Sequence, residues 1–381
     1  MARSVIAGLV CAPLLCASSA AGQPAPAAVP APAPAVWYFA VSGDSRDCGD
    51  IIMPRIAAAI ARNRAAAPID FYWHLGDFRL MSDVDCDILE RARPDYDCAG
   101  RPAGSLGATA MSDYLDTAWQ DFIERQIVPF GATPVFLGIG NHEVRAGRTR
   151  DDFRRAFRKW LTQEPIHSQR TLEAGRHFLS TEGDTYYHFI AKGIDFIYLD
   201  NADSTFSSAE LVWLARVLSQ DAEDPAVKTI VAAMHEALPY SKSRGHAMDA
   251  SCAGLCSGEQ AYDLLFRAHA MAGKHVYVFA SHAHLFLTDI FDQPEHQGQV
   301  LPGWLIGTAG AQQYRPAIEY GYLQVAVHGD GSIEPLFKPV TRDMPPAGPA
   351  GDPLEEYCFT RNQVAAGESA YRGACACGAA P

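Results

Sequence analysis

The chain has 381 residues, a hydrophobic fraction of 48% and a formal net charge of −13, with a pI near 5.4. This length and composition are typical of a globular protein with a sizeable core, in one large domain or two ordinary ones. The acidic balance, without any Lys/Arg-rich block, argues against a protein whose main partner is nucleic acid or an anionic membrane surface. An anionic substrate would need local positive charge, most simply from metal ions.

The chain begins with a segment typical of a secretory signal peptide. Residues 1–21 combine a basic residue, Arg3, with an apolar stretch and a small-residue cleavage region. The stretch is too short for a stable membrane span. Lipoprotein processing is the weaker alternative, because a bulky residue precedes both Cys11 and Cys16. We therefore expect a periplasmic or secreted protein without stable membrane insertion.

An Ala/Pro-rich linker over residues 22–35 follows, and such a run forms neither helix nor sheet. Between residues 36 and 338, apolar strands alternate with amphipathic helices. The expected strands are 36–42, 69–75, 134–139, 186–191, 195–200, 228–234, 275–280, 303–307 and 321–327. The expected helices are 54–64, 112–127, 151–161, 208–218 and 257–271. This alternation predicts an α/β core.

Two segments depart from the alternation. Residues 78–111 contain charged residues, glycines and two cysteines, and an irregular insertion of this length more often carries function than linkage. The tail, 339–381, is rich in Pro, Gly and Ala. We expect the tail to lie on the surface and to be held there by its cysteines.

Eight cysteines remain after the signal peptide, and an even number favours disulfides in an exported chain. The alternative is a zinc site formed by Cys252, Cys256, Cys375 and Cys377, which an oxidising compartment disfavours. Roughly a hundred pairings of eight cysteines are possible, so the sequence leaves the connectivity open.

Polar side chains follow five of the expected strands, at the point where each strand ends. The segments are 43–46 (GDSR), 76–77 (GD), 140–143 (GNHE), 234–237 (MHEA) and 281–284 (SHAH). Ligands bind beyond the carboxyl ends of strands in open α/β sheets, and carboxylate, amide and imidazole groups suit divalent cations. Each fragment alone is typical of a turn, a loop or a core histidine. Five of them together predict a metal site.

In this order the blocks resemble those of the calcineurin-like metallophosphoesterase superfamily, chiefly through GNHE and HAH. The resemblance spans about residues 36–330, and the exported chain with Tyr-rich strands leans towards the purple acid phosphatase-like branch. It implies two mixed β-sheets packed as a sandwich and flanked by helices. It also implies a dinuclear centre of divalent or trivalent ions, whose mixed N/O ligation fits Fe, Mn or Zn.

The resemblance further implies a role for each matching residue. Asp77 would bridge both metal ions. One ion would be completed by Asn141, His235 and His282, and the other by Asp44 and His284. His142 would lie beside the leaving-group oxygen as an electrostatic partner or general acid. A hydroxide bridging the two ions would attack phosphorus in line.

Three positions depart from the family's pattern. Arg46 stands where many relatives have the His of Asp-x-His, and Leu80 stands where the acid phosphatase branch has Tyr, so one metal site is a ligand short. Water or one of three acids could supply that ligand: Asp47, Asp50 or Asp83. Arg46 could bind phosphate oxygens through its planar donor fork or pair with a nearby acid. Ser281, in place of Gly, should be tolerated where φ is below zero.

Other residues near the blocks have weaker claims to a role. His74 is expected in the core, because strand alternation turns it away from the site. Glu143 and Glu236 are expected to orient ligands or to begin helices. Tyr314 and Arg315 come late enough to border the cleft.

The leading hypothesis is an exported, metal-dependent phosphoesterase acting on small-molecule phosphate esters, monoesters in particular. The second hypothesis is a non-catalytic or single-metal binding protein on the same scaffold, and the incomplete metal site motivates it. Metal stoichiometry would separate the two hypotheses. A serine hydrolase is least favoured, because the chain has no Gly-x-Ser-x-Gly elbow. No nucleic-acid partner is expected.

Overall fold

The computed structural model of the chain describes residues 35–92, 98, 108–175, 184–243, 245–314, 316–349, 351–365, 375 and 377. The expected signal peptide, nearly all of the expected linker and Arg315 lie outside these residues. The described residues belong to one unit, which spans 33–381. Among them, no helix combines the length and apolar character that crossing a membrane requires.

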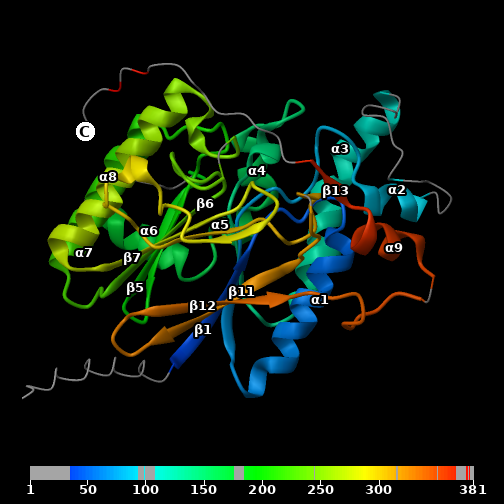
Figure 1. Cartoon of the computed structure of the whole chain (residues 1–381), viewed down its shortest axis with the longest axis horizontal. Coiled ribbons are helices and arrows are strands. Elements are labelled where there is room, and N and C mark those ends of the chain that lie inside the picture. Colours follow the sequence, from blue (N-terminus) through cyan, green and yellow to red (C-terminus); the bar gives the residue numbers. More distant parts are fainter. Residues whose placement is uncertain are drawn as a thin grey trace, which may run out of the picture. The chain divides into compact units, whose positions relative to one another are not determined.

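The first of two large sheets has five strands. They are β1 (Ala35–Ser42), β2 (Ile69–His74), β3 (Val135–Leu137), β11 (Gly321–His328) and β12 (Ile333–Pro339). Their order is β12-β11-β1-β2-β3, with β1, β2 and β3 parallel and β11 and β12 antiparallel to their neighbours. Figure 1 labels β12, β11 and β1 of this sheet. The parallel strands are apolar almost throughout, as strands covered on both faces require.

The second large sheet has six strands. They are β4 (Tyr187–Ala191), β5 (Ile194–Leu199), β6 (Thr229–Met234), β7 (His275–Ala280), β8 (Phe286–Thr288) and β9 (Gly303–Ile306). Their order is β4-β5-β6-β7-β9-β8, and the four inner strands run parallel. A separate short ladder pairs β10 (Gln313–Tyr314) with β13 (Gln363–Val364).

Aromatic rings fill the space between the two large sheets. Phe39 and Phe71 of the first sheet contact Phe196 of the second, with ring centroids 5.2 and 5.1 Å apart. Phe136 stacks on Phe189 at 4.6 Å. All five rings are buried, and such pairs stabilise beyond the area they bury. The expected sandwich of two mixed sheets is confirmed.

Helices flank the sheets. They are α1 (Gly49–Arg62), α2 (Cys86–Ala92), α3 (Ala108–Phe122), α4 (Arg150–Ala156), α5 (Arg158–Leu161), α6 (Ile166–Gly175), α7 (Ser208–Glu223), α8 (Cys252–Ala272) and α9 (Pro353–Thr360). α7 and α8 pack side by side next to β5–β7 (Figure 1). Trp213 of α7 and Leu265 of α8 are fully buried in one apolar cluster with Ile230 of β6. On the other sheet, α1 buries Ile52 and Ile56 in the second cluster.

All eight cysteines among the described residues form disulfides. The pairs are Cys48–Cys358, Cys86–Cys98, Cys252–Cys375 and Cys256–Cys377. The expectation of disulfides is confirmed. The alternative zinc site is wrong, because its four thiols are bonded to one another in pairs. Three of the four bridges fasten the tail beyond residue 339 to the sandwich.

Candidate metal centre

The five polar blocks meet at one edge of the sandwich. They follow β1, β2, β3, β6 and β7, whose carboxyl ends face the same side because the strands are parallel within each sheet. Backbone bonds tie the blocks together. Asp44 N donates to Gly76 O at 3.0 Å, and Ser281 N donates to His235 O at 2.8 Å. The structure therefore brings together side chains that lie far apart in the chain.

Three residues at this edge have a left-handed backbone. Their φ values are 61° at Asp44, 59° at Asp77 and 64° at His282. Such values are uncommon outside glycine, and strain of this kind, roughly 1–3 kcal/mol per residue, concentrates at functional sites. The sharp turns fix where the three side chains leave the strands.

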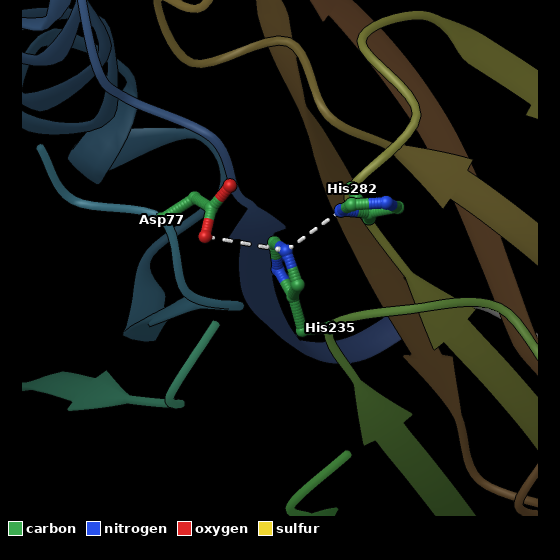
Figure 2. Close-up of side chains that lie close together, drawn as sticks. All are labelled: Asp77, His235 and His282. Carbon is green, nitrogen blue, oxygen red and sulfur yellow. Dashed lines mark hydrogen bonds and ion pairs between the residues drawn. The ribbon is translucent and has the colours of Figure 1, made fainter. Parts of the chain in front are cut away.

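The first donor group consists of Asp77, His235 and His282, whose ligand atoms lie within 4.8 Å of one another (Figure 2). His235 Nε2 is 3.3 Å from Asp77 Oδ1 and 3.1 Å from His282 Nδ1. A first-row transition-metal cation whose bonds to its ligands are about 2.1 Å long holds neighbouring ligand atoms roughly 3.0–3.4 Å apart. The group therefore fits such a cation.

Hydrogen bonds on the far side of His235 determine which nitrogen faces the other donors. Its Nδ1 donates to the carbonyl of Leu75 at 3.0 Å and lies 3.1 Å from Ser281 Oγ, which leaves the lone pair on Nε2. Burial disfavours the charged ring, but Asp77 outweighs burial and raises the pKa of His235 to about 9. A proton and a cation thus compete for Nε2.

The amide of Asn141 can face the first donor group in two ways. With Oδ1 inward, the oxygen lies 3.0 Å from His235 Nε2 as a fourth donor. With Nδ2 inward, the amide donates to Asp77 Oδ1 at 3.1 Å, and its oxygen accepts from Arg145 Nη2 at 2.6 Å. A cation attracts the oxygen and repels the NH₂ group, so a bound ion would select the first orientation.

The second donor group consists of Asp44, Asp77 and His284, and so shares Asp77 with the first. Asp44 Oδ1 lies 3.4 Å from His284 Nε2, while Asp44 Oδ2 accepts from the backbone N–H of His282 at 2.7 Å. Asp44 Oδ1 is buried, and no described residue forms a hydrogen bond with it. Burial opposes ionisation of this carboxyl, but the neighbouring histidines outweigh burial and lower its pKa to about 2.

Arg46 lies between the two donor groups. Its Nη2 is 2.6 Å from His284 Nε2, its Nη1 bonds to His142 Nε2, and its Nε lies 3.9 Å from Asp77 Oδ2. The guanidinium therefore contacts the donors themselves. None of the three acids considered as substitute ligands belongs to a donor group: Asp47, Asp50 and Asp83. Asp50 instead pairs with Arg79 and Arg91.

His142 is held as a neutral ring. Its Nδ1 donates to the carbonyl of Leu80, so its Nε2 carries the lone pair that Arg46 engages. Burial and the charge of Arg46 lower the pKa of His142 to about 3. Leu80, which stands in place of a family tyrosine, thus orients His142 through its backbone.

Glu143 stabilises the loops of the second and third polar blocks through hydrogen bonds to their backbone. Its carboxylate accepts from the backbone N–H groups of Asp77 at 2.8 Å, Phe78 at 2.9 Å and Gly140 at 2.8 Å. Three backbone donors on one buried carboxylate hold the second and third blocks together. Ser281 has no positive φ, which meets the condition for replacing glycine there.

The remaining expected residues divide between the site and the core. Tyr314 stacks on His284 with ring centroids 5.4 Å apart, and its hydroxyl lies 3.1 Å from His246 Nδ1. His246 was not expected, because no strand-end motif precedes it. His74 is fully buried against Phe122 and belongs to the core. Glu236 is buried, and its backbone N–H donates to Oδ1 of Asn201 at 3.0 Å.

Gly140 makes a close approach that tests this geometry. A Cβ at this position would lie 2.4 Å from Asp77 Oδ1 and 2.9 Å from His235 Cε1. Gly140→Ala should therefore displace two donors and lower kcat/KM for p-nitrophenyl phosphate by about 100-fold, since a shift near 1 Å has that cost. Gly175→Ala is the matched control, because its Cβ would meet no atom of the described residues within 4 Å. Equal activity of the two variants would contradict the geometry.

Comparison with known proteins identifies the family. One solved structure matching the chain is purple acid phosphatase PPD1 from yellow lupin (Lupinus luteus) seeds, with 13% identity and a TM-score of 0.49, over 81% of this chain and 52% of that chain. This chain thus spans about half the length of that phosphatase. Another is GAP50, the anchor in the inner membrane complex of Plasmodium, with 12% identity and a TM-score of 0.43, over 88% of this chain and 99% of that chain.

No curated protein sequence matches the chain. A family model described as calcineurin-like phosphoesterase matches residues 48–284, which is more than half of the chain. The match includes both donors of the HAH block and ends at His284. The chain therefore belongs to the calcineurin-like phosphoesterase family.

Proposed function

We propose that the protein is an exported, metal-dependent phosphoesterase that hydrolyses small-molecule phosphate esters, monoesters above all. The first donor group carries this proposal. Amide, carboxylate and imidazole donors from three other loops lie 3.0–3.3 Å from His235 Nε2, a spacing that suits one cation. Fe, Mn and Zn all accept this mixture of nitrogen and oxygen ligands.

A metal ion bound there would supply Lewis-acid chemistry, by activating water and polarising a phosphoryl oxygen. The residues of the chain position the substrate around it. Arg46 presents planar N–H donors that match phosphate oxygens. His142, whose Nε2 meets Arg46, would act beside the leaving oxygen as an electrostatic partner or general acid.

Local positive charge favours a dianionic monoester despite the net charge of −13. Arg46 lies inside the centre, and the exposed Arg145 lies at its rim beside Asn141. Together with a bound ion, these guanidinium groups would offset the two charges of a phosphate monoester. A diester carries one charge fewer and would gain less from them.

Export is supported by the sequence of residues 1–21 and by the four disulfides, which suit an oxidising compartment. We place the protein in the periplasm or outside the cell. In this proposal, residues 36–338 form the metallophosphoesterase domain, with an insertion at 78–111, and residues 339–381 form the tail.

A non-catalytic or single-metal binding protein on the same scaffold is the second candidate. One contact favours it, because Arg46 Nη2 engages His284 Nε2 and so uses a donor of the second group. Turnover decides between the candidates, since a binding protein would hold metal without hydrolysing any ester.

The proposal is tested by metal removal and return. Purified protein, dialysed against a chelator, should lose hydrolysis of p-nitrophenyl phosphate and regain it when Mn²⁺, Zn²⁺ or Fe²⁺ is added. Bis(p-nitrophenyl) phosphate serves as the diester and should be the poorer substrate. Metal-loaded protein that hydrolyses neither compound would exclude the proposed activity and leave the binding protein.

A further inference from the structure

We propose that Arg46 takes the place of the second metal ion, so that the protein holds one ion, in the first donor group, beside a permanent guanidinium. The inference concerns the proposed phosphoesterase site and rests on that function for its mechanistic meaning. It departs from the dinuclear centre that the family resemblance implies. The reason is the way in which Arg46 uses the donors of the second group.

The first step is the lone pair of His284. The Nδ1 of this ring donates to the carbonyl of Gln312 at 2.8 Å, so the only in-plane lone pair is on Nε2. Arg46 Nη2 lies 2.6 Å from that atom. One lone pair cannot both accept this hydrogen bond and coordinate an ion. A second ion would therefore have to displace Arg46.

The second step is the matching arrangement at His142. Its Nδ1 is bound to the carbonyl of Leu80, and its Nε2 accepts from Arg46 Nη1. Two neutral rings thus hold the two ends of one guanidinium, which fixes its position from both sides. Because Arg stays charged at any pH a protein meets, this positive charge is permanent.

The third step is the supply of ligands. Arg46 stands at the position of the His in the Asp-x-His pattern, so the second group lacks that donor. Asp77 is shared with the first group, and His284 is bonded to Arg46. The second group then keeps only carboxylate oxygens: Asp44 Oδ1, which has no hydrogen bond among the described residues, and Asp77 Oδ2, which lies 3.9 Å from Arg46 Nε. Two oxygens are too few ligands to hold an ion against a neighbouring guanidinium.

The fourth step is the charge that a substrate would meet. One divalent ion and Arg46 together carry three positive charges, against the two carboxylates of Asp44 and Asp77. The surplus favours an arriving phosphate. The guanidinium can exchange its bonds to the two histidines for bonds to phosphoryl oxygens, which have the bidentate geometry that Arg recognises best. Arg46 would thus neutralise the phosphate where relatives use an ion.

The test is metal stoichiometry. Protein loaded with excess Mn²⁺ and freed of unbound metal by gel filtration should contain about one ion per chain by elemental analysis. Its electron paramagnetic resonance spectrum should show an isolated ion. Arg46→His restores the Asp-x-His pattern and should raise the content to about two ions, with a spectrum of an exchange-coupled pair. Arg46→Lys keeps the charge, and should stay at about one.

The wild-type measurement needs no variant, so a folding defect in Arg46→His cannot obscure the result. Two tightly bound ions in the wild type would overturn the inference and leave the proposed hydrolysis intact. One ion without hydrolysis of either ester would support the inference and overturn the proposed function. One ion in folded Arg46→His would also count against Arg46 as the group that excludes the second ion.

Discussion

Asp77→Asn is expected to lower kcat/KM for p-nitrophenyl phosphate by at least about 1000-fold and to remove bound metal. Asp77 is shared by both donor groups, and its Oδ1 lies 3.3 Å from His235 Nε2. Asn has one neutral oxygen, and its NH₂ group repels a cation. Loss of the ion removes several kcal/mol of transition-state stabilisation, and about 4 kcal/mol corresponds to 1000-fold. Elemental analysis and steady-state kinetics check both effects.

Asp116→Asn is the matched control, because Asp116 is exposed on α3 and lies in neither donor group. It should keep metal content and activity. Circular dichroism of both variants separates loss of the site from loss of the fold, since Asp77 Oδ1 also accepts from the backbone N–H of His142 at 2.9 Å. A folded Asp77→Asn protein with full metal content would contradict the role of Asp77 as a metal ligand.

The convergence of the polar blocks could be predicted, because it depends on local sequence and on one topological rule. Each block follows an apolar run, and parallel strands bring their carboxyl ends to one edge. The structure accordingly places Asp77, His235 and His282 within reach of one ion.

The direction of Arg46 could not be predicted in the same way. It depends on left-handed backbone at Asp44 and Asp47, with φ of 61° and 66°, and on a partner, His284, that lies 238 residues away. A sequence motif shows that a residue differs from the one that the family has at that position. It does not predict which atoms the new side chain will contact.

Proline explains two errors in the expected elements. The expected first helix begins at Pro54, a residue favoured in the first turn, but α1 already begins at Gly49 and contains Pro54. Strand β12 is not among the expected strands, and it contains Pro335 and Pro339, which are disfavoured inside a sheet. It occupies the edge of the first sheet, where a missing backbone N–H is tolerated.

Helix α9 shows a local signal that the composition of the tail obscured. Asp352 caps it by accepting from the backbone N–H of Leu354 at 2.9 Å, and Pro353 follows as the first helical residue. This Asp-Pro start was readable in the sequence. The pairing of Cys358 in the same helix was not, since it depends on packing between the two ends of the described chain.

Replacing Cys48 and Cys358 by Ala is expected to lower the free energy of unfolding by about 5 kcal/mol, because this disulfide spans 310 residues and closes the longest loop among the four bridges of the described residues. The bridge fastens α9 beside the first polar block. Cys48 N and Asn362 Nδ2 both donate to Gly310 O at 3.2 Å. The free energy is measured by guanidinium denaturation without reductant.

The Cys86–Cys98 bridge is the matched control, because it spans only 12 residues. Replacing both of its cysteines by Ala should cost about 3 kcal/mol, since the entropy of loop closure grows with the logarithm of loop length. An equal or larger loss for the short loop would mean that strain or local packing, rather than the restriction of the unfolded chain, determines what each bridge contributes. No residue of the first donor group belongs to either bridge, so metal content should stay unchanged in either variant.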